Sequence, residues 1–403
     1  MNIVDRFIKY CKIPTMSKED SSETPSTSKQ FDLAKVLLEE LKQLDVEDAY
    51  LNDKCIVYGH LKANTDIPTK KIGFVAHMDT SPDMNDVGCN PRIIENYNGE
   101  DIVLNKELNI VMTKEAFPHL NKDIGSDLIV TDGTTLLGGD DKAGVAAIMD
   151  MLETLKNNPE IKHGQISICF TPDEEVGRGT ENFSCEEFDA DFAYTVDGGD
   201  VCDIEYENFN AASAIVKIKG LSIHPGDAKD KMINAIRVAE EFDYLLPMNK
   251  RPECTEKYEG FNHCVEFKGA CEESMMTYII RNHDLNELEI QKEEFRNAQR
   301  IINEKYGPNT CNVEIIDAYR NMKECILPHI EIVENVKEKM KKLGLNPTSS
   351  AIRGGTDGAS ITYMGIPCPN LGNGDRNCHG KFEYVSINEL KLASKLLVEI
   401  VKI

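Results

Sequence analysis

Residues 71–83 read KIGFVAHMDTSPD, an apolar run that ends in a histidine and an aspartate two positions apart. In an extended chain, residues at positions i and i+2 point to the same side, so His77 and Asp79 share one face. Open α/β sheets bind their ligands at the carboxyl ends of the strands. The segment therefore predicts a buried strand with a candidate site at its end, although H-x-D alone also fits an ordinary surface turn.

Strand and helix patterns alternate on the carboxyl side of this segment. Residues 142–155 have the spacing of a helix, and further apolar runs lie at 165–170 and 193–196. Such alternation favours a mostly parallel sheet that is covered by helices. We therefore predict an α/β fold built around residues 71–83.

The pattern changes in the middle of the chain. Residues 211–219, 264–270, 275–281 and 313–319 read as strands, and residues 234–246 and 285–306 read as helices. The order βαββαβ is that of a ferredoxin-like domain. We predict a catalytic α/β domain in two pieces, residues 1–207 and 321–403, with a lid domain inserted at residues 208–320.

Composition excludes several classes of protein. The 403 residues include 45 Lys and Arg against 69 Asp and Glu, which gives a net charge of −24. Such an acidic chain repels phosphate backbones, so we expect no nucleic-acid partner. We see no apolar run long enough to cross a membrane, and the 13 cysteines include no C-x-x-C pair. We therefore expect a cytoplasmic protein with reduced thiols and no membrane partner.

Acidic residues and one more histidine follow other predicted strands and loops: Asp140 and Asp141 after a glycine pair, Asp173, Glu174 and Glu175 after residues 165–170, Asp197 after residues 193–196, and His379 in a glycine-bounded loop. Each has an ordinary explanation, since acids favour helix starts and solvated loops. Together, two histidines and three carboxylates at one sheet edge can hold two zinc ions with positions left open. A glutamate that is not needed as a ligand can then act as a general base.

These motifs resemble those of the two-zinc peptidase family that includes glutamate carboxypeptidase, carnosinase and the aminoacylases. The family motifs stand here as HMD, GGDDKAG, DEEVG, TVDGG and NCHGK. Longer stretches, among them NIVMTKEAFPHL, SIHPGDAKDKMINA and SAIRGGTDGA, resemble the tripeptide aminopeptidases of this family. The resemblance covers nearly the whole chain, and it implies a zinc-dependent aminopeptidase that releases the first residue of a tripeptide.

The resemblance also implies a role for each site residue. Two Zn²⁺ ions per subunit would be held by His77, Asp140, Glu175, Asp197 and His379, with Asp140 as the bridge between them. Glu174 would be the general base, and Asp79 would orient His77. In the lid, His224 would polarise the scissile carbonyl group, and Arg353 has the fork that suits the carboxylate of a peptide.

Several alternatives stay open. A dipeptidase or an N-acyl amino-acid deacylase of the same family would use the same site. A metal- or peptide-binding protein without activity would not need Glu174, and a glycosidase with paired carboxylates would not need two histidines among them. The lid of family members often forms dimers but need not, so a homodimer is an open expectation. The cis or trans state of the peptide bond after Asp140 and the role of Cys378, beside His379, are also open.

Overall fold

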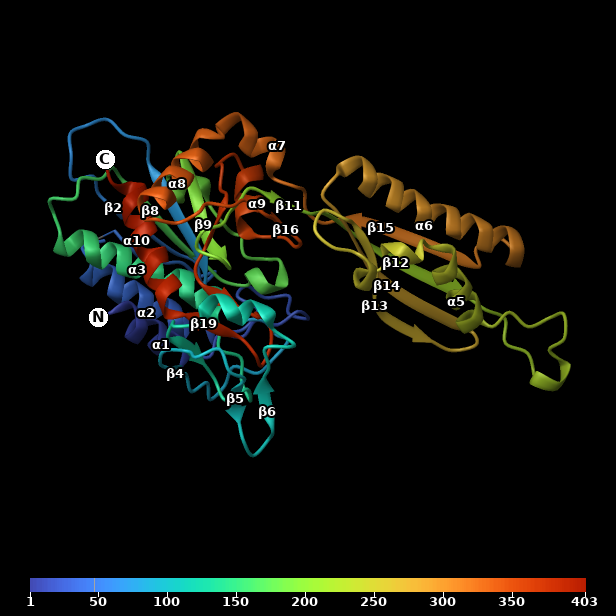
Figure 1. Cartoon of the computed structure of the whole chain (residues 1–403). Helices are drawn as coiled ribbons and strands as arrows, with labels where there is room; N and C mark the ends of the chain where they lie inside the picture. Colours follow the sequence, from blue (N-terminus) through green and yellow to red (C-terminus); the bar gives the residue numbers. More distant parts are fainter. Residues whose placement is uncertain (47) are drawn as a thin grey trace. The chain divides into compact units, whose positions relative to one another are not determined.

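The computed structural model describes residues 1–46 and 48–403, which form two compact units (Figure 1). Unit 1 comprises Met1–Tyr206, Glu324–Ser350 and Thr356–Ile403, and unit 2 comprises Glu207–Lys323 and Ala351–Gly355. The second unit therefore takes in a short return segment that lies outside the predicted range 208–320. This happens because β16 (Ala351–Ile352) pairs in parallel with β11 (Glu207–Asn208). The catalytic and lid roles of the two units stay predictions.

Unit 1 is built on a sheet of seven strands in the described residues, in the order β1-β2-β8-β3-β9-β17-β10. The strands are β1 (Tyr50–Leu51), β2 (Val57–Leu61), β3 (Ile72–His77), β8 (Ile166–Thr171), β9 (Phe192–Gly198), β10 (Ile204–Glu205) and β17 (Asn370–Gly372). β8, β3, β9 and β17 run parallel, while the strands at both edges are antiparallel. The predicted α/β fold is confirmed.

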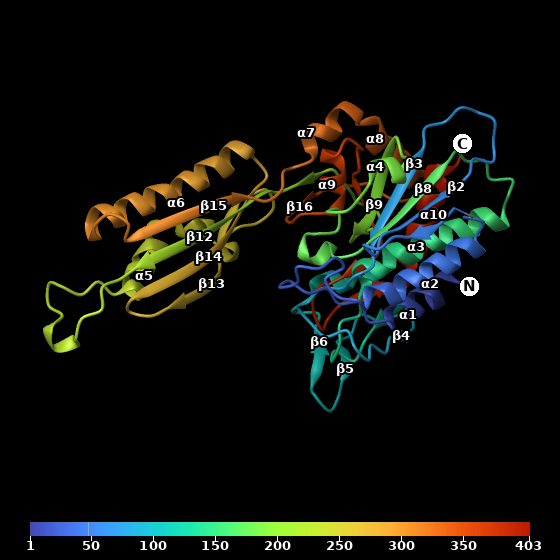
Figure 2. The same ribbon diagram turned by 180° about the vertical axis from the view of Figure 1, so that it is seen from behind.

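Helices cover both faces of this sheet (Figure 2). The helices that lie wholly or partly in unit 1 are α1 (Ile3–Cys11), α2 (Gln30–Gln43), α3 (Gly139–Asn157), α4 (Cys185–Phe188), α7 (Lys323–Ile326), which crosses the boundary to unit 2, α8 (Glu331–Lys342), α9 (Asp357–Tyr363) and α10 (Ile387–Val401). α3 packs on β3 and β9, with α1 and α10 beside it, and α4 and α9 lie on the opposite face. Because consecutive strand residues face opposite sides, each face of β3 contributes to a separate apolar layer.

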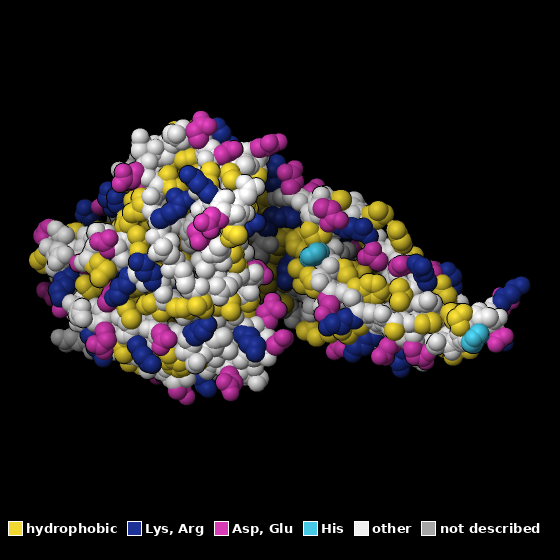
Figure 3. Space-filling view, turned by 90° about the horizontal axis from the view of Figure 1, so that it is seen from below, with side chains coloured by type: hydrophobic (Ala, Val, Ile, Leu, Met, Phe, Trp, Pro, Cys, Tyr) yellow, Lys and Arg dark blue, Asp and Glu magenta, His cyan; other side chains and the backbone are white. Residues whose placement is uncertain are grey.

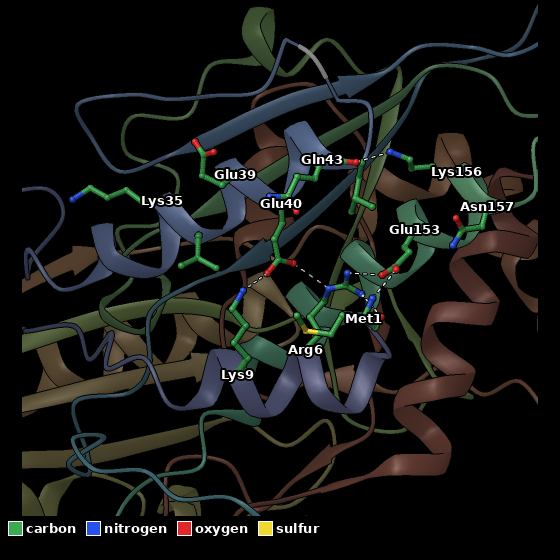
Figure 4. A pocket seen from close by; sticks show the side chains of 12 residues that line it. Met1, Arg6, Lys9, Lys35, Glu39, Glu40, Gln43, Glu153, Lys156 and Asn157 are labelled. Atoms are coloured by element: carbon green, nitrogen blue, oxygen red, sulfur yellow. Dashed lines mark hydrogen bonds and ion pairs between the residues drawn. The ribbon is translucent and has the colours of Figure 1, made fainter.

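The N-terminal helix is tied to its neighbours by a buried charge network. Asn2 caps α1 by accepting the N–H of Asp5. The Glu40 carboxylate on α2 then binds Arg6 at 3.2 Å, Lys9 at 2.5 Å and the Tyr10 hydroxyl at 2.8 Å. Arg6, Lys9 and Glu40 line a pocket of about 650 Å³ between α1, α2 and α3 (Figure 4). Each charge in the network has an opposite partner, which offsets the cost of burying it.

A second, smaller sheet of unit 1 was not predicted from the sequence. Its described strands, in the order β18-β19-β7-β4, are β18 (Asp375–Arg376), β19 (Tyr384–Ser386), β7 (Leu128–Val130) and β4 (Arg92–Ile94), and a separate hairpin joins β5 (Ile102–Asn105) to β6 (Ile110–Met112). These strands have two to four residues each. So few residues carry too little alternation to be recognised as strands.

Unit 2 has the predicted βαββαβ order. Its elements are β12 (Asn210–Lys219), α5 (Ala235–Leu245), β13 (Phe261–Gly269), β14 (Glu273–Asn282), α6 (Leu285–Tyr306) and β15 (Cys311–Asp317). The four strands form an antiparallel sheet in the order β13-β14-β12-β15. Phe242 of α5, Phe295 of α6 and Tyr278 of β14 meet in its core. Unit 2 therefore has a hydrophobic core of its own.

The surface and the helices agree with the composition. On the face drawn in Figure 3, acidic and basic side chains are interspersed over the described residues, so the negative charge is spread out. Within the part of the chain that the structure describes, no helix combines the length and the apolar character that crossing a membrane requires.

Candidate metal centre

The sheet of unit 1 brings the predicted ligands together at one edge. His77 is the last residue of β3 and lies opposite Thr171, the last residue of β8. Glu174 and Glu175 follow β8 in a short 3-10 turn, and Asp197 lies near the end of β9. Parallel strands end at the same edge, so these side chains meet although they come from distant parts of the sequence.

Two groups of potential ligands share the carboxylate of Asp140. On one side, His77 Nε2 lies 2.8 Å from Asp140 Oδ1 and 3.6 Å from Asp197 Oδ1. On the other side, His379 Nε2 lies 2.9 Å from Glu175 Oε2 and 3.3 Å from Asp140 Oδ2. In each group the ligand atoms lie within 4.8 Å of one another. Asp140 thus presents one oxygen to each group, as a bridging carboxylate would.

The chemistry of these groups fits divalent cations. Burial, together with the charge of Asp140, raises the pKa of Asp197, and the same two causes raise the pKa of Glu175 to about 7. Glu175 Oε1 is buried and has no hydrogen-bond partner among the described residues. Hydrogen bonds to Asp140 and Glu175 raise the pKa of His379 to about 11, so a proton and a metal ion would compete for its ring. Imidazole and carboxylate ligands in sets of three suit zinc with one position open.

Asp79 contacts the backbone of Glu174 and Glu175 in addition to His77, which it was predicted to orient. His77 Nδ1 lies 3.1 Å from the carbonyl oxygen of Asp79 and 3.4 Å from its carboxylate. The carboxylate itself accepts the backbone N–H groups of Glu174 at 3.0 Å and Glu175 at 3.2 Å. The fully buried Asp79 therefore positions the glutamate turn as well as the ring of His77.

Comparisons with known proteins agree with this geometry. The profile of Peptidase family M20/M25/M40 matches residues 132–403. A protein of Alkaliphilus oremlandii named Peptidase T is 48% identical over 100% of this chain and 99% of its own length. Another Peptidase T, from Clostridium perfringens, is 49% identical over 99% of this chain and 98% of its own length. This chain belongs to peptidase family M20/M25/M40.

Solved structures have the same fold as this M20 family member. An aminopeptidase of Bacillus cereus matches with a TM-score of 0.77 at 24% identity, over 99% of this chain and 97% of that one. A tripeptidase of Staphylococcus aureus matches with a TM-score of 0.79 at 23% identity, over the same shares. A Bacillus subtilis protein described as a dinuclear metal-binding peptidase of the M20 family has a TM-score of 0.64 at 14% identity, with 99% and 96% covered.

Asp141 has a different task from Asp140, and its peptide bond to Asp140 is cis. Its carboxylate accepts the N–H of His77 at 3.2 Å, the N–H of Gly144 at 3.1 Å and the side-chain amide of Asn373 at 2.8 Å. The same amide of Asn373 donates to the carbonyl oxygen of Val196 on β9. Asp141 therefore fastens the start of α3 to the two strands that carry His77 and Asp197.

Sequence reasoning missed three buried supports of this M20 site: Asn370, Asn373 and Glu383. Asn370 accepts the N–H of Asp197 and donates to its carbonyl oxygen. Glu383 accepts backbone N–H groups near Asp140. Asparagine and glutamate are common in loops, so nothing in the local sequence marked these residues. Only their position four to nine residues from His379 placed them near a motif.

His224 and Arg353 belong to unit 2. The side chain of His224 is 80% exposed, and its Nδ1 accepts the N–H of Gly226. Arg353 donates to the carbonyl oxygens of Lys257 and Glu259 and to the Thr255 hydroxyl. Its guanidinium lies 5.1 Å from the ring centre of Phe209. Three of its five N–H groups are thus engaged within unit 2, and the others can still bind a ligand.

Cys378 contacts an acid rather than a metal ligand of the two groups. Its Sγ donates to Asp375 Oδ2 at 2.7 Å, and Asp140, Asp375 and Cys378 form a third set of closely spaced potential ligands. Desolvation of the sulfur and the charge of Asp375 raise the pKa of the Cys378 thiol, although the residue as a whole is exposed. Cys378 is therefore held as a neutral thiol, which is a poorer metal ligand than a thiolate.

Proposed function

We propose that the protein is a zinc-dependent tripeptide aminopeptidase of the cytoplasm that releases the N-terminal residue of its substrate. The observation that carries the proposal is the pair of ligand groups that share Asp140, with Glu174 beside them. The names of the relatives at 48% and 49% identity support the tripeptide substrate. His77, Asp140 and Asp197 would hold one zinc ion, and Asp140, Glu175 and His379 the other.

Glu174 would carry the proton transfers. Two bound zinc ions would supply a polarised carbonyl group and a water molecule of lowered pKa. Glu174 would take a proton from the attacking water and would later give it to the leaving amine. Asp79 keeps the backbone of Glu174 in place, since it accepts the N–H of that residue. His224 would stabilise the negative charge that develops on the carbonyl oxygen.

Arg353 would set the length of the substrate. Its remaining N–H groups suit the C-terminal carboxylate of a peptide, and its contacts with Thr255, Lys257 and Glu259 reduce the entropy lost when it binds. Amidation of the C-terminus would remove the charge that Arg353 recognises. We expect kcat/KM to fall for the amide, and an unchanged value would exclude this role of Arg353.

The decisive experiment compares a free tripeptide with its N-acetylated form, using zinc-loaded protein and mass spectrometry of the products. Release of the first residue from the free peptide alone supports the proposal. Cleavage of the acetylated form would instead indicate a deacylase, and cleavage of dipeptides alone a dipeptidase. No cleavage of any of these substrates would indicate a binding protein. A homodimer remains a prediction, which sedimentation equilibrium would test.

A further inference from the structure

Glu383 lies just before β19 and its side chain points at the loop that leads to Asp140. The residue is 1% exposed. Its Oε2 accepts the N–H groups of Leu137 and Gly138, both at 2.8 Å, and its Oε1 accepts the N–H of Asp140 at 3.2 Å. One buried carboxylate therefore satisfies three N–H groups of a segment that lies more than 240 positions earlier in the chain.

The segment that Glu383 holds departs from helical geometry, although α3 is assigned from Gly139 onward. Gly138 has a φ of 77°, and Asp140 has φ −81° and ψ 105°, which is outside the helical range. The first N–H groups of a helix have no acceptor within the helix. The Glu383 carboxylate supplies that acceptor here. A Cβ atom on Gly139 would lie 3.2 Å from Glu383 Oε1 and 2.9 Å from Val385, so the loop packs directly on this segment.

The other end of Glu383 is fixed to the segment that carries His379. The N–H of Glu383 donates to the carbonyl oxygen of Gly380 at 3.1 Å, which closes the turn after His379. β19 follows at once and pairs with both β18 and β7. Glu383 therefore joins the loop of Asp140 to the loop of His379, although the two loops are far apart in sequence.

Joining the two loops through a buried carboxylate costs free energy, because the charged group loses its hydration. Burial raises the pKa of Glu383 to about 8, against the effect of its N–H donors. Within the described part of the chain, Glu383 forms no ion pair, so the N–H groups are what offsets its loss of hydration. Packing alone would not need such a group. The three hydrogen bonds of the Glu383 carboxylate instead fix the direction and the distance at which Asp140 faces His379.

We propose that Glu383 is a positioning residue, which sets the place of the bridging carboxylate of Asp140 and thereby the affinity of both metal ions. The inference rests on the proposed two-ion centre. Because Asp140 belongs to both ligand groups, a shift of its backbone changes both sites together. Glu383 does not touch either ion in this proposal and acts only through the loop that it holds.

Two substitutions test the proposal. In Glu383→Gln, the oxygen can replace one carboxylate oxygen, but the NH₂ group must face an N–H donor of the loop. Glu383→Ala removes every acceptor. We expect the affinity for both Zn²⁺ ions, measured by competition with a chromophoric chelator, to fall about tenfold in the first variant and about a hundredfold in the second. The visible absorption of the Co²⁺-loaded protein should change as well, because the ligand geometry changes.

Glu40→Gln is the matched control, because Glu40 is also a buried glutamate that joins distant segments. Glu40 binds Arg6 and Lys9 (Figure 4), and it accepts the hydroxyl of Tyr10. It should lower the melting temperature and leave metal affinity and the Co²⁺ spectrum unchanged.

Wild-type affinity in both Glu383 variants, or a loss confined to one ion, would overturn the proposal. If Glu383→Ala does not fold, Glu383→Gln decides alone. Failure of the wild-type protein to bind two ions would instead overturn the metal centre itself, and this inference with it.

Discussion

At the scale of single residues, adjacent acidic residues in this site make different kinds of contact. Asp140 faces two histidines, whereas Asp141 accepts hydrogen bonds from His77, Gly144 and Asn373. In the same way, Glu175 contacts His379 while Glu174 stays outside both ligand groups. Each pair thus contributes one potential metal ligand and one residue outside the two ligand groups.

Glu174→Gln separates proton transfer from metal binding. The amide keeps the size of the side chain but cannot accept and return a proton, so we expect kcat to fall about 10²–10⁴-fold. Both ions should still bind, because Glu174 belongs to neither ligand group. Metal content by atomic emission and kcat on a free tripeptide measure the two effects. Glu181→Gln, an exposed change in the same region, should alter neither. Near-normal turnover in Glu174→Gln would exclude Glu174 as the base.

Asp79→Asn disturbs the turn that carries Glu174 and Glu175. The two carboxylate oxygens each accept one N–H, so the amide NH₂ must face one donor. We expect kcat/KM to fall about 10–100-fold, with a smaller effect on the free energy of unfolding. Asp86→Asn is the control, because Asp86 is also buried and accepts two backbone N–H groups, those of Thr15 and Met16. A normal rate with lowered stability would make Asp79 purely structural.

The sequence predicted the candidate ligands that the structure brings together, but it did not predict the side chains that hold these candidates in place. His77, Asp140, Glu175, Asp197 and His379 stand at strand ends or in glycine-rich loops, where their chemistry is recognisable. Asn373 and Glu383 act through backbone groups of residues far away in the sequence. A hydrogen bond to a backbone group can be made with any residue type. Such a bond therefore produces no recognisable pattern in the sequence.

At the scale of elements, the contact of α3 with β9 is close because Gly144 has no side chain. A Cβ atom there would lie 2.0 Å from the carbonyl oxygen of Val196 and 2.4 Å from Asp141 Oδ1. Gly144→Ala should therefore lower the free energy of unfolding by about 3 kcal/mol. Urea unfolding measures this loss. Gly199→Ala, whose Cβ would have only ordinary contacts at 3.7 Å, should stay near the wild-type value.

The strand pair of β10 and β17 makes stability depend on pH. Burial raises the pKa of Glu205 from 4.5 to about 7, and Asn370 donates to its carboxylate. The unfolded chain then ionises first, so the free energy of unfolding falls as pH rises from about 4.5 to 7. The loss is complete above pH 7 and amounts to about 3 kcal/mol.

Glu205→Gln should remove this loss. Urea unfolding at pH 5 and pH 8, in the presence of a chelator, should show a smaller difference between the two pH values than in the wild type. The exposed change Glu107→Gln is the control and should leave that difference as it is. An equal pH dependence in Glu205→Gln and the wild type would contradict the prediction.

Long elements could be predicted, and short ones could not. α6 (Leu285–Tyr306) was predicted with its observed bounds, because six turns of helix repeat the apolar spacing many times. Residues 366–371 form an apolar run, but only its last two residues belong to a strand, β17 (Asn370–Gly372). Pro367 and Pro369 do accept hydrogen bonds from β9, but they have no N–H to return. β7 and β19 have three residues each, so they are recognised only through their pairing within the sheet β18-β19-β7-β4.

At the scale of the molecule, the two units have separate cores, and the proposed ions bind only to residues of unit 1. Calorimetry should show two transitions, of which chelation lowers one. With free zinc at about a thousand times its Kd, each ion stabilises unit 1 by about 4 kcal/mol. Phe295→Ala, in the core of unit 2, should lower the other transition alone. A single transition that moves as a whole in both experiments would contradict independent units.

The place of β17 in the sheet has a consequence for synthesis on the ribosome. β17 lies between β9 and β10, but its residues 370–372 are made more than 160 positions after both neighbours. The elements β12 to β15 of unit 2 form one continuous stretch and are complete long before that. Until residues 370–372 are made, the nascent chain therefore contains the complete elements β12 to β15 of unit 2, while β9 of unit 1 lacks its partner strand β17. Chaperones that shield exposed strand edges should be needed most during this interval.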